Sequence, residues 1–391
     1  MNFTGNRLKR VVQVWLRNVL LVFLISTIAA CTWLPVSIIP DPIKTSTPTV
    51  TQTTTPISLP PTITPTTTPK ATQTATVTPI PYDLTVFQSK VLLRDVTPQG
   101  YIGDTCEYLN LRWGQDKSKP GTIVVPVMYH SVRQEGKSVS DPMDVTHEYF
   151  MNTMQHAKQL GFETITTEQL VGFLKNNESI PPRSMILIVD DRRPGVIRQH
   201  FLPVLDANDW TVTLAYITGV AADWEWKELL RLNQNNRLDM QAHGFLHNGS
   251  TYFTEFTSPE IVEQELFGPI PLIEQYFGRP PMAFIWPGGN YTPEAIAVAH
   301  EAGYEIGFTV HARGPVMFNW IPLGESEIAM NDPLMVLPRY WSNSAYINLD
   351  QAVELSIQAE EFAQSNQADE YHWYQLFCPG YADLVPFGPG E

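Results

Sequence analysis

Two adjacent aspartates and two nearby histidines have the types and spacing needed for metal-assisted hydrolysis. Asp190 and Asp191 directly follow the apolar run 185–189, which places two carboxylates at the end of a predicted strand. Side chains alternate along a strand, so adjacent aspartates point in different directions and can take different roles. One can bind a metal while the other accepts a proton. The alternative is a strand-terminal pair that caps the next helix.

Two histidines four residues apart, His243 and His247, follow a second predicted strand over 238–242. Neutral histidine is the usual zinc ligand, and imidazoles at this spacing can converge on one metal. Surface histidines also reach this spacing by chance. Together with one aspartate, however, they supply an Asp-His-His ligand set. Such a set leaves coordination positions free for water and substrate, as a catalytic zinc site requires.

The elements that would position these residues alternate between short apolar runs and amphipathic stretches from residue 121 onward. This alternation predicts an α/β fold with a mostly parallel sheet, open or closed into a barrel, whose site lies at the carboxyl ends of the strands. The predicted strands cover 123–128, 185–189, 212–217, 238–242, 282–286 and 306–310. The predicted helices cover 108–113, 146–160, 194–207, 224–232, 259–277, 293–302 and 348–364, with irregular structure over 371–387.

Four motifs occur in the order typical of one enzyme family. They are Val125-Pro126-Val127-Met128-Tyr129-His130, Ile188-Val189-Asp190-Asp191-Arg192, His243-Gly244-Phe245-Leu246-His247 and Phe284-Ile285-Trp286-Pro287-Gly288-Gly289. From about residue 122 to residue 341, the chain resembles the polysaccharide deacetylases with a NodB-homology domain, carbohydrate esterase family four, in its Pro-Tyr-Gly-like branch. The resemblance implies a deformed (β/α) barrel with seven strands.

By the same resemblance, Asp191, His243 and His247 bind a divalent metal, for which zinc is the first candidate, and Asp190 is the general base. The chemistry of these residue types agrees, because a water activated by a metal needs an adjacent carboxylate to accept its proton. The N–H of Gly288 would help to hold the developing oxyanion. The implied reaction is hydrolysis of N-acetyl or O-acetyl groups on a cell-wall or extracellular polysaccharide.

Four further residues are candidates for contact with the oxyanion or the substrate. They are Trp286, Pro287, Tyr291 and Arg339. The family's general-acid motif, Leu-x-His, is absent, and Leu337-Pro338-Arg339 occupies a comparable place. His130 is therefore the candidate general acid, with His311 as the alternative, and either histidine could instead be structural.

Two departures from the family pattern keep other functions open. Arg192 replaces the glycine that follows the two aspartates, and Ile285 replaces the arginine that braces the base. One alternative is therefore a catalytically degenerate protein that binds glycan without turnover. Another is a hydrolase of cyclic amides or imides, which the family also contains.

The first residues have the layout of a secretory signal. A basic stretch containing Arg7, Lys9, Arg10 and Arg17 precedes the apolar run 19–30 and then Cys31. The sequence before Cys31 resembles a bacterial lipobox, which implies a lipid-anchored protein outside the cytoplasm. An uncleaved signal anchor is the alternative, although the run is shorter than the roughly 20 residues that span a bilayer.

The composition, together with the two resemblances, predicts five segments along the chain. They are a signal peptide with lipobox over 1–31, a Thr/Pro-rich disordered linker over 32–82, an N-terminal flank over 83–119, the polysaccharide deacetylase domain over 120–345, and a C-terminal helix and tail over 346–391. The linker has almost no apolar residues to bury, so it cannot offset the entropy of ordering.

The charge and the remaining cysteines narrow the class of protein further. With 25 basic and 40 acidic residues the chain has a formal net charge of −15. This balance argues against nucleic-acid binding, which needs clustered Lys and Arg. Cys106 and Cys378 flank the predicted domain as an even pair. Outside the cytoplasm they would form a disulfide, and the alternative is two buried free thiols.

Overall fold

The computed structural model describes residues 85–381, apart from 140, 142 and 248–251. These residues belong to one compact unit, Thr76–Glu391. The predicted signal peptide, the lipidation site Cys31 and the Thr/Pro linker lie outside the described residues. Among the helices that are described, none combines the length and the apolar character needed to cross a membrane.

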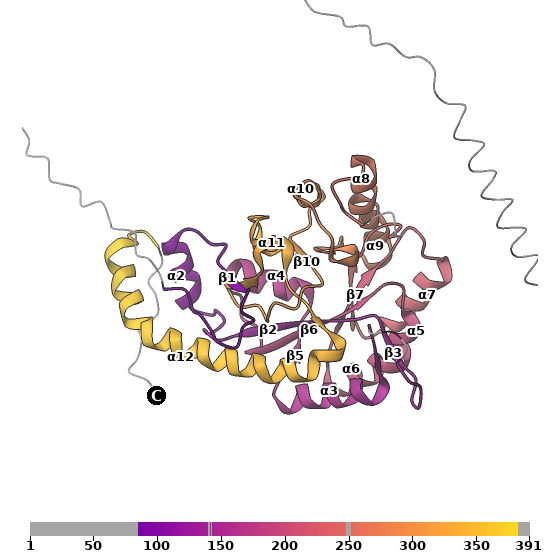
Figure 1. The fold of residues 1–391 in the computed structure, drawn as a ribbon, viewed down its shortest axis with the longest axis horizontal. Helices are drawn as coiled ribbons and strands as arrows, with labels where there is room; N and C mark the ends of the chain where they lie inside the picture. The colour runs from indigo at the N-terminus through magenta and orange to yellow at the C-terminus, as the bar shows by residue number, and fades with distance from the viewer. Residues whose placement is uncertain (1–84, 140, 142, 248–251, 382–391) are drawn as a thin grey trace, which may run out of the picture. The chain divides into compact units, whose positions relative to one another are not determined.

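The centre of the described unit is a parallel sheet. Its strands follow the order β10-β9-β8-β7-β6-β2-β12, and every neighbouring pair on this path is parallel (Figure 1). The strands are β2 (Ile123–Tyr129), β6 (Arg183–Asp190), β7 (Val212–Tyr216), β8 (Leu238–Ala242), β9 (Ala283–Ile285), β10 (Ile306–Phe308) and β12 (Tyr340–Trp341), with β5 (Glu163–Thr164) pairing beside β6. The predicted α/β class and parallel sheet are confirmed.

The two edges of this sheet approach each other through the segment before β12. Leu337 forms a parallel bridge with Phe308 at the end of β10, and three residues later Tyr340 pairs with Val127 of β2. The sheet is therefore curled rather than flat. Strands β2, β7, β8, β9 and β10 have no exposed residue, so the sheet is covered on both faces.

Helices follow most strands, as the alternating pattern predicts. They are α3 (His147–Gln159), α4 (Thr167–Asn176), α5 (Pro194–Val196), η1 (Ile197–Phe201), α6 (Leu202–Asn208), α7 (Asp223–Leu232), α8 (Pro259–Phe267), α9 (Pro269–Phe277), α10 (Pro293–Glu301) and α11 (Glu325–Ile328). The sequence did not predict α4. The single helix predicted over 259–277 is divided at Gly268, because Pro269 has no N–H to continue the hydrogen-bond ladder.

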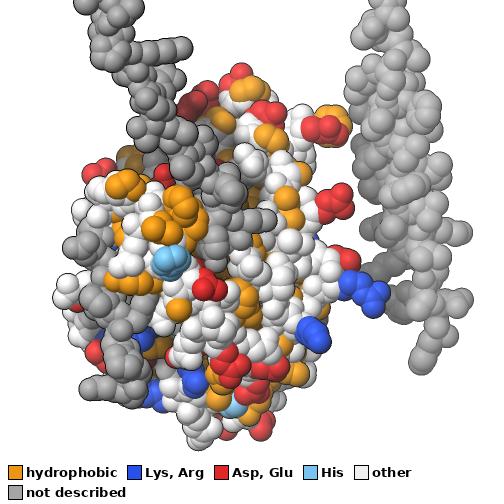
Figure 2. All heavy atoms as spheres, turned by 90° about the vertical axis from the view of Figure 1, so that its left-hand side faces the viewer, with side chains coloured by type: hydrophobic (Ala, Val, Ile, Leu, Met, Phe, Trp, Pro, Cys, Tyr) orange, Lys and Arg blue, Asp and Glu red, His pale blue; other side chains and the backbone are white. Residues whose placement is uncertain are grey.

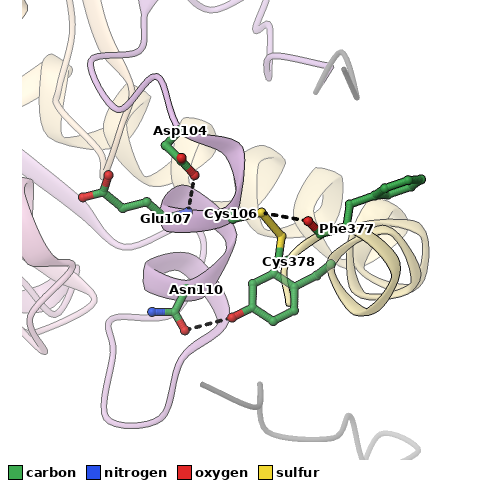
Figure 3. The surroundings of a disulfide bond; sticks show 7 residues. Asp104, Cys106, Glu107, Asn110, Phe377 and Cys378 are labelled. Carbon is green, nitrogen blue, oxygen red and sulfur yellow. Dashed lines mark hydrogen bonds between the residues drawn. A yellow bond between two sulfur atoms is a disulfide. The ribbon is translucent and has the colours of Figure 1, made fainter. Parts of the chain in front are cut away.

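Outside the sheet, a small module joins the two flanks of the domain. Helix α2 (Thr105–Trp113) contacts the end of α12 (Ala345–Phe377), and a disulfide links Cys106 to Cys378 (Figure 3). The predicted disulfide is confirmed. The predicted end of the last helix at residue 364 was wrong, because α12 continues to Phe377. The buried Tyr374 packs there with Leu109 of α2 and donates a hydrogen bond to Asn110.

Two short pairings complete the described elements. Strand β1 (Thr97–Gln99) pairs antiparallel with β11 (Ile321–Leu323), and β3 (Ser131–Arg133) pairs parallel with β4 (Asp144–Thr146). On the face at the α2 and α12 end, Lys and Arg side chains are scattered singly among acidic and apolar ones (Figure 2). This distribution fits the negative net charge of the chain.

Candidate active site

The candidate catalytic and metal-binding residues lie at the carboxyl ends of parallel strands. Asp190 is the last residue of β6, His243 directly follows β8, and His130 directly follows β2. Because neighbouring strands are parallel, their carboxyl ends meet at one end of the curled sheet. The topology therefore brings together side chains that are far apart in sequence.

Three of these side chains form a cluster that could hold a metal ion. Each of Asp191, His243 and His247 offers one ligand atom, and these atoms all lie within 4.8 Å of one another. His243 is buried, while the other two residues are partly exposed. A site with one protected ligand and two facing solvent leaves room for water and substrate.

The environment of His243 suits a metal ligand. Its Nδ1 lies 2.7 Å from the carbonyl oxygen of Ile285, an arrangement in which the Nδ1–H donates and Nε2 is left with a free lone pair. Burial lowers the pKa of His243 below its ordinary value, which favours the neutral imidazole that binds metals. The donor set and its tautomer therefore fit a divalent ion such as zinc.

The backbone at this cluster is held in unusual conformations. Asp191 has φ of 69° and His247 has φ of 39°, in the left-handed region that residues other than glycine rarely occupy. Such conformations persist only where surrounding contacts impose them, and they concentrate at functional sites. Asp191 also forms an ion pair with Arg193, at 3.1 Å.

Asp190 is not a member of this cluster and takes part in a buried ionic network. The residue is 1% exposed, and its Oδ1 accepts a hydrogen bond from Arg339 Nη1 at 2.7 Å. Its Oδ2 lies 3.8 Å from Nε2 of His130. Burial raises the pKa of this carboxyl, but Arg339, His243 and His130 outweigh burial, so the pKa lies below its ordinary value. Asp190 is therefore an ionised carboxylate beside a histidine.

Arg339 has a different position from the one expected from sequence. It was expected to contact the oxyanion or the substrate, whereas its side chain is fully buried. Its Nε donates to the carbonyl of Thr309 at 2.7 Å while Nη1 donates to Asp190. Arg339 thus braces the aspartate, a contact for which Ile285 has no functional group. The segment that closes the curled sheet supplies this arginine.

The segment after β9 contributes backbone rather than side chains. Gly288 adopts φ of 61°, and its N–H has no hydrogen-bond acceptor in the part of the chain that the structure describes. Pro287 is buried and lies against Gly244 in the turn between the two histidines. The free N–H makes Gly288 a candidate donor to an oxyanion.

The two aromatic residues that were expected to contact the substrate are buried or half-buried. Trp286 is fully buried, and its Nε1 donates to the carbonyl of Met335 at 2.8 Å. Its ring therefore belongs to the core, contrary to expectation. Tyr291 is half-buried against Trp286, with 6.3 Å between ring centroids, and burial raises its pKa to about 12.

Arg192 does not direct its charge at the cluster. Its Nη1 lies 2.7 Å from Oε2 of Glu225 in α7 and 2.8 Å from the carbonyl oxygen of Val220. The structure thus accommodates the side chain that replaces the family's glycine. Within the described residues His311, the alternative acid, forms no ion pair with Asp190. Its backbone carbonyl accepts a hydrogen bond from the backbone N–H of Arg339 at 3.2 Å.

Two residues at the site were not predicted from sequence. The ring of Tyr252 meets the ring of His247 edge to face, with 5.7 Å between centroids, and lies close to Gly288. Glu265 in α8 is fully buried and accepts hydrogen bonds from the turn before His247. A signal for Glu265 exists, because a charged residue there interrupts the apolar stripe of Val262, Leu266 and Pro269.

Comparisons with known proteins find matches to the part of the chain that carries this site. Residues 177–307 match the polysaccharide deacetylase family model. The chain is similar to a Streptococcus pyogenes deacetylase, PplD, solved with acetate (21% identity, 59% of this chain and 98% of that chain, TM-score 0.47). It is also similar to IcaB from Ammonifex degensii (17% identity, 60% and 97%, TM-score 0.46) and to BC0361, a polysaccharide deacetylase from Bacillus cereus (18% identity, 59% and 69%, TM-score 0.45).

A comparison with curated protein sequences finds no match. The family match contains Asp190, Asp191, His243 and His247, and it lies inside the predicted domain 120–345. His130 and Arg339 lie outside the matched residues and reach the site only through the fold. Over residues 177–307, the chain carries a polysaccharide deacetylase domain.

Proposed function

We propose that this protein is a metal-dependent hydrolase that removes N-acetyl or O-acetyl groups from a cell-wall or extracellular polysaccharide. The single observation that carries the proposal is the convergence of Asp191, His243 and His247 beside a separate buried carboxylate, Asp190. A ligand set with an independent base next to it suits hydrolysis better than a structural metal site does.

In this proposal Asp191, His243 and His247 hold a divalent metal, and zinc suits a set of one carboxylate and two imidazoles. A bound zinc ion supplies Lewis-acid chemistry and makes a nearby water more acidic at neutral pH. The hydrogen bond from Nδ1 of His243 to Ile285 fixes the ring and leaves Nε2 as the nitrogen that would bind the metal.

The other residues of the site move protons and hold charge. Asp190 accepts the proton of the attacking water, and Arg339 keeps this carboxylate oriented by its 2.7 Å hydrogen bond. The N–H of Gly288 donates to the oxyanion that develops on the acetyl oxygen. His130, 3.8 Å from Asp190 and partly exposed, donates a proton to the leaving amine or alcohol.

Two aspartate variants test these roles, because they should fail differently. Asp191→Ala removes one of three protein ligands, so zinc content and activity should fall together. Asp190→Asn keeps all three ligands, so zinc should stay bound while turnover falls by about 10²–10⁴. Zinc content is measured beside acetate release from chitooligosaccharides, acetylxylan and peptidoglycan, with and without added zinc.

The same assay separates the competing functions. Wild-type protein that binds zinc and glycan but releases no acetate would be a non-catalytic binder. Activity confined to cyclic amides or imides would overturn the substrate class. Zinc loss in Asp190→Asn with full retention in Asp191→Ala would show that the two roles are reversed.

We further propose that the protein is anchored outside the cytoplasm by a lipid on Cys31. The disulfide between Cys106 and Cys378 supports an oxidising compartment. Cells grown with a labelled lipid precursor should tag the wild type and leave Cys31→Ser untagged, and equal labelling of both would reject lipidation.

A further inference from the structure

Glu265 is a buried carboxylate that contacts the turn between the two histidines. Its side chain comes from α8 and is fully buried. Oε2 accepts from the N–H of Phe245 at 2.8 Å and from the N–H of His247 at 3.2 Å. Oε1 accepts from the N–H of Leu246 at 2.9 Å. Three successive backbone donors therefore converge on one carboxylate.

These backbone dipoles are the partners that make burial of the charge tolerable. No salt bridge joins Glu265 to a Lys, Arg or His side chain within the described ranges. Successive N–H groups form a concave anion-binding arrangement, and hydrogen bonds to an ionised acceptor are stronger than neutral ones. The turn and the carboxylate therefore depend on each other: without the turn the charge is unpaired, and without the charge three donors are unpaired.

Gly244 provides the space for this contact. It has φ of 87°, and a Cβ at this position would lie 2.5 Å from Oε2 of Glu265. A side chain at this position would therefore collide with the carboxylate.

We propose that Glu265 is a positioning residue that sets the place of His247 in the metal site. His247 has a left-handed backbone, with φ of 39°, and its own N–H is one of the three bonded to Glu265. The carboxylate thus offsets the cost of a conformation that points the imidazole toward Asp191 and His243. The inference rests on the proposed metal site, and Glu265 itself touches neither metal nor substrate.

The test replaces Glu265 with glutamine in the full chain. Glu265→Gln keeps the shape but turns one acceptor into an NH2 group that faces backbone donors. Zinc affinity, measured by competition with a chromophoric chelator, should fall by about 10–100-fold. Glu263→Gln is the matched control, because Glu263 lies on the same helix and is exposed. The control should bind zinc like the wild type.

Cobalt substitution adds a signal that general destabilisation would not move. The visible absorption of cobalt bound to Glu265→Gln should change in shape, because His247 would be displaced, while Glu263→Gln should match the wild type. Gly244→Ser would place a side chain against the carboxylate of Glu265 and should also weaken zinc binding. This second variant keeps the proposal testable if Glu265→Gln fails to fold.

The outcomes separate the two levels of inference. Wild-type protein that binds no zinc would contradict the proposed function. Wild-type protein that binds zinc, with unchanged affinity and cobalt spectrum in both Glu265→Gln and Gly244→Ser, would overturn the positioning role alone.

Discussion

Two buried carboxylates in different parts of the molecule pair with arginine, yet their pKa values move in opposite directions. Asp190 at the end of β6 pairs with Arg339, and Glu370 in α12 pairs with Arg112. Burial raises the pKa of both carboxyls. At Asp190 the interactions with Arg339, His243 and His130 outweigh burial and the pKa is lowered, whereas at Glu370 burial outweighs Arg112 and the pKa is raised.

The difference comes from the number and the distance of the partners. Arg339 is fully buried and lies 2.7 Å from Asp190, with His130 and His243 adding to its effect. Glu370 has one arginine at 3.2 Å and a hydrogen bond from the Trp113 indole. The comparison teaches that one arginine does not by itself offset the effect of burial on the pKa of a carboxyl. The carboxylate proposed as a base has a fully buried arginine at 2.7 Å and two histidines beside it, whereas the carboxyl of Glu370 has one arginine at 3.2 Å.

The largest expected effect is the loss of the arginine beside Asp190. Arg339→Met leaves an ionised carboxylate buried without its main partner, which should cost about 3–5 kcal/mol of unfolding free energy. Arg112→Met should cost clearly less, because burial has already raised the pKa of Glu370 and this carboxyl can be neutralised by protonation more easily than Asp190. Urea unfolding of both variants at neutral pH measures the difference. Equal losses of unfolding free energy in the two variants would contradict the difference inferred between the two carboxyls.

The next largest effect concerns the disulfide that links α2 to the end of α12, the helix that carries Glu370. Cys106 and Cys378 are 272 residues apart, so their bond restricts a long loop in the unfolded chain. Cys106→Ser should lower the unfolding free energy by about 2–4 kcal/mol, the contribution typical of a disulfide. Zinc affinity should be unchanged, because neither cysteine contacts the metal cluster. Reduced zinc binding in the folded variant would show that the two regions are coupled.

The smallest effect is a change in pH dependence. A raised pKa in the folded state means that protonation of Glu370 stabilises the fold. That stability is fully present below the ordinary value of 4.5 and is lost as pH rises through the raised pKa. Glu370→Gln carries no titrating group at this position and should lack this decline in thermal midpoint as the pH rises above 4.5. A variant with the same pH profile as the wild type would contradict the raised pKa.

Much of the site could be predicted from the sequence because its residues stand next to strands. A strand such as β6 is recognisable as an apolar run, and in a parallel sheet all carboxyl ends share one side. Asp190, Asp191 and His243 are therefore placed near one another by local pattern and by the rules of parallel sheets. The left-handed conformations of Asp191 and His247 carry no such local signal.

Other features were decided by contacts between distant segments. The apolar pattern fades after residue 364, but α12 continues because Tyr374 and Cys378 pack with Leu109 across the module. Trp286 resembled a sugar-stacking residue, yet the curled sheet encloses it in the core. In both cases the burial of apolar side chains in the folded protein outweighed the preference indicated by the local sequence.

The sequence by itself determined the α/β class, the strands that carry the two motifs and the pairing partners available to the cysteines. Only the tertiary structure decided that Arg339, 149 residues from Asp190, would brace that carboxylate, and that Glu265 would hold the turn before His247. The physical reason is that a buried charge must find a partner wherever the fold provides one, and neither composition nor spacing records which distant donor will lie within 3 Å.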